Sequence, residues 1–142
     1  MIIPDVNLLV YAVNRDAPQH RRAKAWLESA ISGPETVGMS WNVLLAFIRL
    51  TTRAGLLRSP LSPEAALDLV ELWLEQPSVT AVSPGPAHLS ILRELVSGIG
   101  TAGNLTSDAH LAAIAIEHGA ELHSSDTDFR RFPRLIWRNP LA

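Results

Sequence analysis

The chain has 142 residues, of which 47% are hydrophobic and 18% are charged. Such a length and composition are typical of one compact domain with a buried core, and they exclude a disordered chain. The absence of cysteine excludes disulfide frameworks and thiolate zinc sites. The N-terminus lacks the pattern of a signal peptide, and no apolar run approaches the roughly 18 residues that span a membrane. We therefore expect a single domain over residues 1–142, cytoplasmic and without contact to a membrane.

The periodicity of apolar residues predicts strands that alternate with helices. Ser62 followed by Pro63 is a strong helix start, because serine caps a helix and proline fits its first turn. Glycines at 98, 100 and 103 predict a loop. The elements expected in chain order are a strand at 1–4, a short helical or irregular turn at 8–14, a helix at 20–31, a strand at 36–39, a helix from 41 to about 53, a helix at 63–76, a strand at 79–82, a helix with apolar positions from 89 to 99, a helix at 107–118, and strands at 121–123 and 135–137.

This alternation predicts an α/β fold with a mainly parallel central sheet of about four to five strands. Four aspartates interrupt otherwise apolar or turn-like sequence where these elements meet. Asp5 follows the first strand, Asp108 opens a helix, and Asp126 and Asp128 follow the strand at 121–123. Carboxylates at the ends of strands and the starts of helices are well placed to share a hard divalent cation such as Mg²⁺. The leading interpretation is a metal-dependent enzyme acting on phosphodiesters.

Each aspartate also has a purely structural alternative. Asp5 can cap the turn after the strand, and Asp108 can gain from the dipole of its helix. Asp126 and Asp128 can be the side chains of an Asx turn. Position along the chain leaves both interpretations open.

The basic residues are compatible with a nucleic-acid partner. Eleven of the twelve are arginine, whose planar fork suits phosphate. Setting the four aspartates apart from the formal charge of −2 leaves a net +2 on the rest of the chain. Solvated surface charge explains the same pattern, so this signal alone decides nothing.

Three segments together resemble the PIN domain, and most closely the VapC toxins of bacterial toxin–antitoxin pairs. They are Asp5-Val6-Asn7, the stretch from Gly103 to Ala113, and the stretch from Ser124 to Phe129. The resemblance implies a PIN-like α/β/α sandwich. It also implies a toxin that is an endoribonuclease dependent on Mg²⁺, or on Mn²⁺ as a substitute, and that cleaves tRNA or rRNA. A cognate VapB-type antitoxin would neutralise it. A homodimer is expected from the resemblance and from the broad apolar surface of the helix at 63–76.

Carried over to this sequence, the resemblance implies a role for six residues. Asp5, Asp108 and Asp126 match the catalytic, metal-binding acids, and Asp128 matches a further, more variable metal ligand. Asn7 and Ser125 match polar neighbours that orient the carboxylates.

The helix expected from residue 41 departs from the family pattern. Many PIN domains carry a glutamate where Ala46 stands, and no acid occurs between Glu35 and Glu64. Arg49 and Arg53 lie on one side of that helix and are candidate contacts for the RNA backbone. The missing glutamate keeps open an alternative function, a catalytically weak or inactive PIN fold that only binds a partner protein or RNA. Other enzymes fit less well, because a dehalogenase-type phosphatase needs an aspartate at the position of Asn7.

Overall fold

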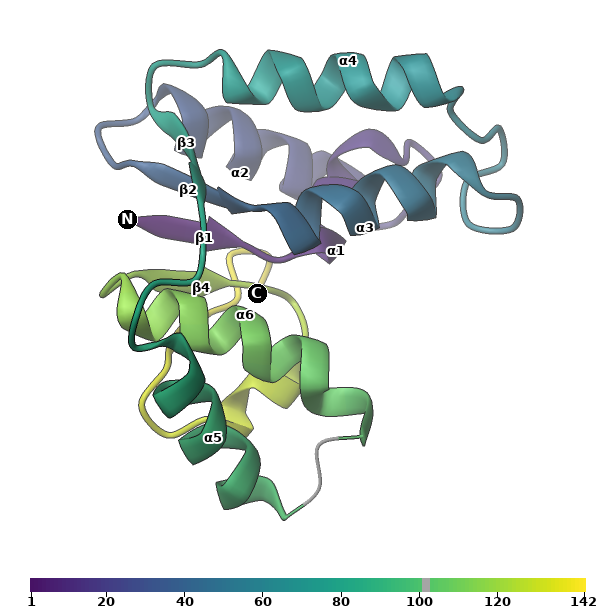
Figure 1. The fold of residues 1–142 in the computed structure, drawn as a ribbon. Coiled ribbons are helices and arrows are strands. Elements are labelled where there is room, and N and C mark those ends of the chain that lie inside the picture. Colours follow the sequence, from purple (N-terminus) through teal and green to yellow (C-terminus); the bar gives the residue numbers. More distant parts are fainter. Residues whose placement is uncertain (101–102) are drawn as a thin grey trace.

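Five parallel strands form one sheet at the centre of the computed structural model, which describes residues 1–100 and 103–142 (Figure 1). The strand order is β3-β2-β1-β4-β5. Pairing is parallel throughout, for example between Ile3 in β1 and Leu122 in β4. The strands are β1 (Ile2–Pro4), β2 (Val37–Ser40), β3 (Val79–Val82), β4 (Glu121–His123) and β5 (Ile136–Arg138).

Helices connect and flank the strands. In Figure 1, α2, α3 and α4 lie around the half of the sheet that contains β2 and β3, and α5 and α6 pack on each other beside β4. The helices are α1 (Val6–Val13), α2 (His20–Ser32), α3 (Trp41–Thr52), α4 (Pro63–Leu74), α5 (His88–Ile99) and α6 (Thr106–Glu117), with two short 3-10 turns, η1 (Gly103–Leu105) and η2 (Thr127–Arg131).

The predicted α/β architecture with a mainly parallel sheet is confirmed. Each predicted strand and helix exists, with ends that differ by a few residues. The turn expected at 8–14 is a regular helix that begins earlier, at Val6, because Asp5 caps it. The predicted cap of α4 is also present, since the Ser62 hydroxyl accepts a hydrogen bond from the Ala65 N–H at 3.1 Å. The predicted loop is shorter than expected, because Gly98 belongs to α5, and residues 101–102 lie outside the described residues.

The order of the strands creates a crevice beside β1. From β1 the chain proceeds outward through β2 and β3, and then crosses to the other side of β1 for β4 and β5. Connections therefore leave β1 and β4 in opposite directions at their carboxyl ends. In open parallel sheets, ligands bind at this switch point. Asp5 and Ser124 directly follow these two strands.

Helix α6 is buried on nearly all sides. Its alanines at 109, 112, 113 and 115 are fully buried, as is Ile114. Small side chains let this helix approach the strands and α5 closely, and packing at such density leaves it little freedom to shift. Its first turn, which carries Asp108, is consequently fixed relative to β1 and β4.

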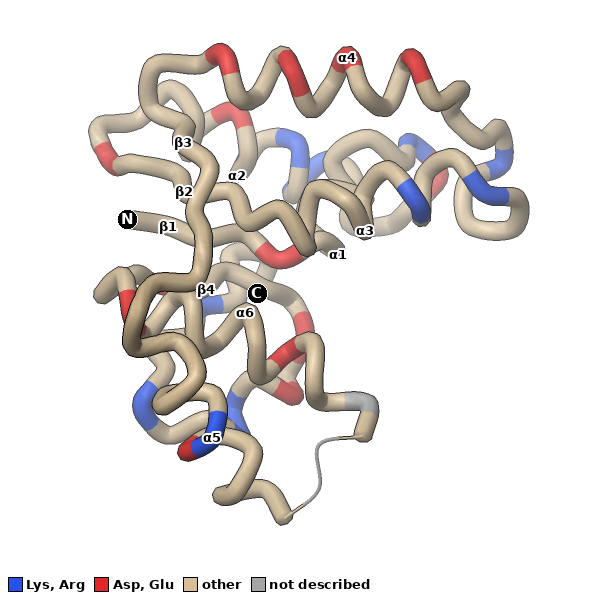
Figure 2. The backbone as a smooth tube through the Cα atoms, viewed as in Figure 1, with Lys and Arg blue, Asp and Glu red and all other residues tan. Residues whose placement is uncertain are grey.

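Charged residues are distributed unevenly over the backbone. Figure 2 shows acidic residues along α4, basic residues at the end of α3, and a further acidic group where β1, α6 and the segment after β4 meet. Within the part of the chain that the structure describes, no helix is both long and apolar enough to cross a membrane.

Candidate active site

Asp5 ends β1 and begins α1. Its Oδ1 accepts a hydrogen bond from the Val6 N–H at 2.8 Å, and its Oδ2 accepts one from the Ser124 hydroxyl at 2.7 Å. Burial raises the pKa of the Asp5 carboxyl, while these two hydrogen bonds oppose the rise by stabilising the charged form. The carboxylate is therefore held in one orientation at the switch point.

Asp108 lies in the first turn of α6, on the other side of the crevice. Burial, followed by repulsion from Asp5, Asp126 and Asp128, raises the pKa of Asp108 to about 6. The three other aspartates are thus close enough for their charges to act on this one. A carboxylate that is destabilised by its like-charged neighbours is relieved by a bound cation.

Asp126 and Asp128 occupy the segment that follows β4. Asp126 caps η2, because its Oδ1 accepts a hydrogen bond from the Asp128 N–H at 2.9 Å. Asp128 is exposed, with its Oδ1 4.0 Å from the Nε of Arg131. The turn and cap roles considered for Asp5 and Asp126 are therefore real, and they coexist with the convergence of the acids.

Three of the acids are close enough to share one ion. Single carboxylate oxygens of Asp108, Asp126 and Asp128 all lie within 4.8 Å of one another. Such a spacing suits a hard cation that takes oxygen ligands at about 2.0–2.6 Å, as Mg²⁺, Mn²⁺ and Ca²⁺ do. Asp5 stands beside this group with both oxygens hydrogen-bonded. The donor set thus fits a hard divalent cation.

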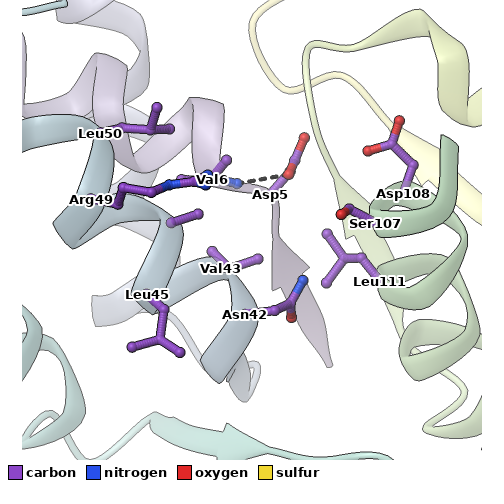
Figure 3. A pocket seen from close by; sticks show the side chains of 11 residues that line it. Asp5, Val6, Asn42, Val43, Leu45, Arg49, Leu50, Ser107, Asp108 and Leu111 are labelled. Carbon is purple, nitrogen blue, oxygen red and sulfur yellow. Dashed lines mark hydrogen bonds between the residues drawn. The ribbon is translucent and has the colours of Figure 1, made fainter. Parts of the chain in front are cut away.

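Two of the acids, Asp5 and Asp108, line a cleft of about 470 Å³ between α3 and α6. In Figure 3, Asp5 lies between the two helices and Asp108 projects from α6. The α6 side also contributes Ser107 and Leu111. The α3 side consists of Asn42, Val43, Leu45, Ala46, Arg49 and Leu50.

Ser124 forms hydrogen bonds to both Asp5 and Asp126, whereas the sequence interpretation predicted Ser125 as the residue that orients the carboxylates. The fully buried Ser124 hydroxyl donates to Asp5 and accepts from the Asp126 N–H at 3.0 Å and from the Asn7 amide at 3.3 Å. Ser125, the next residue, is only half-buried. Successive side chains after a strand point in different directions, so a shift of one residue exchanges the buried position for a half-buried one.

Of the α3 residues that the sequence singled out, two line the cleft and one does not. Ala46 and Arg49 line the cleft, so the position of the missing glutamate faces the acids. Arg53 is exposed at the C-terminal end of α3 and is not among the residues that line the cleft. Asn42, which the sequence interpretation did not select, lines the cleft one helical turn before Ala46.

We expect Ser124→Ala to weaken Mn²⁺ binding by about tenfold, as loss of an orienting partner of a metal ligand does. The change removes a hydrogen bond that lowers the pKa of Asp5 and leaves buried polar groups unpaired, which costs about 1–3 kcal/mol of stability. Calorimetric Mn²⁺ titration and melting curves measure both effects. Ser125→Ala is the matched control and should change neither. Equal effects of the two substitutions would contradict this assignment.

A family model described as the PIN domain matches residues 2–135. The chain belongs to the PIN-domain family. Ribonuclease VapC33 of Mycobacterium tuberculosis is 48% identical to it over 141 residues, which cover 99% of each chain. Ribonuclease VapC37 of the same organism is 46% identical over 142 residues, or 100% of this chain and 99% of the relative. The resemblance to VapC ribonucleases that three short motifs predicted is therefore confirmed over the length of this PIN domain.

Solved structures agree on the fold. VapBC2 from Rickettsia felis, bound to a DNA fragment from its promoter, superposes with a TM-score of 0.72 at 21% identity and covers 98% of both chains. VapC20 of Mycobacterium tuberculosis, a sarcin–ricin loop cleaving toxin, superposes with a TM-score of 0.62 at 20% identity and covers 92% of this chain and 93% of its own. At such identities the likeness establishes the PIN-type α/β/α fold alone.

Proposed function

We propose that this PIN-domain protein is a VapC-type toxin, an endoribonuclease that uses Mg²⁺, or Mn²⁺ in its place, and that residues 1–142 act as one catalytic domain. The observation that carries the proposal is the convergence of four aspartates from three segments of the chain, two of which, Asp5 and Asp108, line one cleft. The identity to VapC ribonucleases supports the choice of RNA as the substrate.

Asp108, Asp126 and Asp128 would hold the cation, and Asp5 would face it from between α3 and α6. When bound, a divalent cation supplies charge for a phosphoryl oxygen and lowers the pKa of water. Asp126, whose Oδ1 accepts a hydrogen bond from the Asp128 N–H, would complete the ligand set or orient an attacking water as its base. The Ser124 hydroxyl holds Asp5 in position, and the Asn7 amide in turn donates to that hydroxyl.

The substrate class that we propose is a folded RNA, a tRNA or an rRNA. The cleft is open, and it carries Arg49 on the wall opposite Asp108. Recognition of folded RNA rests on backbone contacts and shape. Arg49 is accordingly the stronger of the two arginine candidates, while Arg53 can contact only RNA that extends beyond the cleft.

The decisive experiment is cleavage of total RNA by the purified chain. We expect discrete fragments with Mg²⁺ or Mn²⁺ and none with EDTA. Asp5→Asn should remove the activity, which excludes a contaminating nuclease. If the chain bound RNA but left it intact with either cation, the alternative function, a catalytically inactive binding module, would be favoured. The reason to consider that alternative is that Ala46 lines the cleft at a position where many PIN domains carry a glutamate.

A VapB-type antitoxin is the proposed protein partner. An apolar groove of about 600 Å³ lies between α1, α2 and α4, away from the acids, and is lined mainly by aliphatic side chains and Trp73. Leu72 is 53% exposed at its edge, which favours an amphipathic segment of a partner protein.

We expect Leu72→Asp to release a co-expressed antitoxin in co-purification and to leave RNA cleavage unchanged. Retention of the antitoxin would place it elsewhere.

We further propose a homodimer. The sequence interpretation placed the contact on helix 63–76, where Leu67 is exposed. However, α3 exposes two apolar side chains one helical turn apart, Trp41 and Leu45, and Leu45 also lines the cleft. A two-fold contact there would set two acidic clefts side by side. Light scattering at high micromolar concentration should give a dimer for the native chain and a monomer for Trp41→Asp. A native monomer would contradict the proposal, and dissociation by Leu67→Asp alone would move the contact to α4.

A further inference from the structure

The two walls of the cleft have opposite chemical character. The α6 side and the end of β1 present the carboxylates of Asp108 and Asp5, whereas the α3 side carries no acid. Among its otherwise apolar side chains stand Asn42, Ala46 and Arg49. These three residues are spaced by four and then three positions, so they form one stripe along the helix. An amide thus stands at one end of the stripe, a guanidinium at the other, and a methyl group between them.

The amide of Asn42 is oriented by the residue that ends β2. The buried Ser40 hydroxyl donates a hydrogen bond to the Oδ1 of Asn42. The Nδ2 of Asn42 is consequently turned toward the cleft, as Figure 3 shows, and within the described part of the chain it donates to no protein group. Two N–H donors therefore face the space between α3 and the acids.

We infer that Asn42 is a substrate-positioning residue, which binds a non-bridging phosphate oxygen of the RNA strand on the α3 wall while Arg49 supplies the positive charge beside it. The inference rests on the proposed function. A phosphodiester between the walls carries negative charge that the aspartates alone would repel. Donors on the opposite wall offset this repulsion and fix the strand at a set distance from the carboxylates, because hydrogen bonds to a charged oxygen are strong and directional. The small side chain of Ala46 leaves room for the strand.

The test is binding of a fluorescein-labelled, single-stranded RNA of mixed sequence, about 20 nucleotides long, followed by anisotropy in Mg²⁺. An Asp108→Asn parent keeps the RNA intact. We expect Asn42→Ala to weaken binding about tenfold, as loss of a hydrogen bond to a charged group does. We expect Asn42→Asp to weaken it about a hundredfold, because it turns a carboxylate toward the phosphate. Ala25→Asp, which adds the same charge at an exposed position of α2, should change binding less than twofold.

Salt dependence separates the two residues of the stripe. Arg49→Gln should reduce the slope of log K against log salt by about 0.7, the value for one phosphate contact on a single strand. Asn42→Ala should leave that slope and the affinity for Mn²⁺ unchanged, which a general distortion of the cleft would not do. Melting curves verify that each variant is folded.

Two results would overturn the inference. One is binding of RNA by folded Asn42→Ala and Asn42→Asp within threefold of the parent. The other is tighter Mn²⁺ binding by Asn42→Asp without loss of RNA affinity, which would mean that the amide oxygen faces the cleft as a metal ligand. Failure of the proposed function looks different: total RNA would stay intact in the native background, whereas the binding series does not depend on cleavage.

Discussion

Replacing Asp108 with asparagine is expected to reduce metal-dependent RNA cleavage by at least about 10²–10³-fold and to raise the melting temperature of the metal-free protein. The first effect follows because Asp108 belongs to the carboxylate group that fits a cation. The second follows because its charge is unfavourable in the folded state, where burial and three like-charged neighbours raise its pKa from 3.8 to about 6. The activity assay and the melting curve therefore move in opposite directions.

The pH dependence of the second effect has a definite sign. Below the unfolded pKa of 3.8, Asp108 is protonated in both the folded and the unfolded state and does not reduce the stability of the fold. Above about pH 6 it is ionised in both states, and its charge destabilises the folded state to the full extent. In EDTA, the advantage of Asp108→Asn over the native chain should thus grow from pH 4 to pH 6 and then level off. Mg²⁺ should stabilise the native chain more than the variant.

Asp68→Asn is the matched control, because Asp68 is an exposed aspartate on α4 outside the cleft. It should leave cleavage unchanged and show no such dependence on pH. If Asp108→Asn cleaved RNA at the native rate, Asp108 would have no place in the mechanism. A melting advantage that did not vary with pH would show that charge repulsion is not its cause.

Replacing Ala46 with glutamate is expected to tighten Mn²⁺ binding about tenfold, or about 1.4 kcal/mol. Ala46 lines the cleft with Asp5 and Asp108, so a longer acidic side chain at this position can reach the same space. A glutamate added to the four aspartates of the site attracts the cation when it is present. Without the cation, the added carboxylate repels the aspartates. The metal-free variant should therefore melt a few degrees lower, and saturating Mn²⁺ should restore its melting temperature.

Calorimetric titration with Mn²⁺ beside melting curves with and without the ion measures both effects. Ala25→Glu, at an exposed position of α2, controls for the added charge and should change neither. A variant of Ala46 that melted much lower, bound Mn²⁺ no better and was not rescued by it would mean that the glutamate is buried without partners, at a cost of several kcal/mol.

The order of elements and the family were predictable from the sequence, because both depend on local patterns. The spacing of apolar residues within a segment predicts whether it is a strand or a helix. Ser62-Pro63 likewise predicts the start of α4 without reference to the rest of the fold. Asp5, Asp108 and Asp126 stand out because they interrupt such patterns at the ends of elements. The alternation of strands with helices also determines which edge of the sheet these residues reach, since parallel strands end on the same side.

Contacts between distant segments were decided only by the tertiary structure. Ser124 and Asp5 are 119 positions apart, and no local pattern distinguishes Ser124 from Ser125 as the partner of Asp5. Nor does the sequence of α3 reveal that Asn42 faces the acids, because its orientation depends on Ser40 and on the packing of α3. The sequence alone thus determined which aspartates are the candidates for the chemistry. The packing of α3 and α6 against β1 and β4 decided how those side chains face one another, because direction and distance arise only when the elements come together.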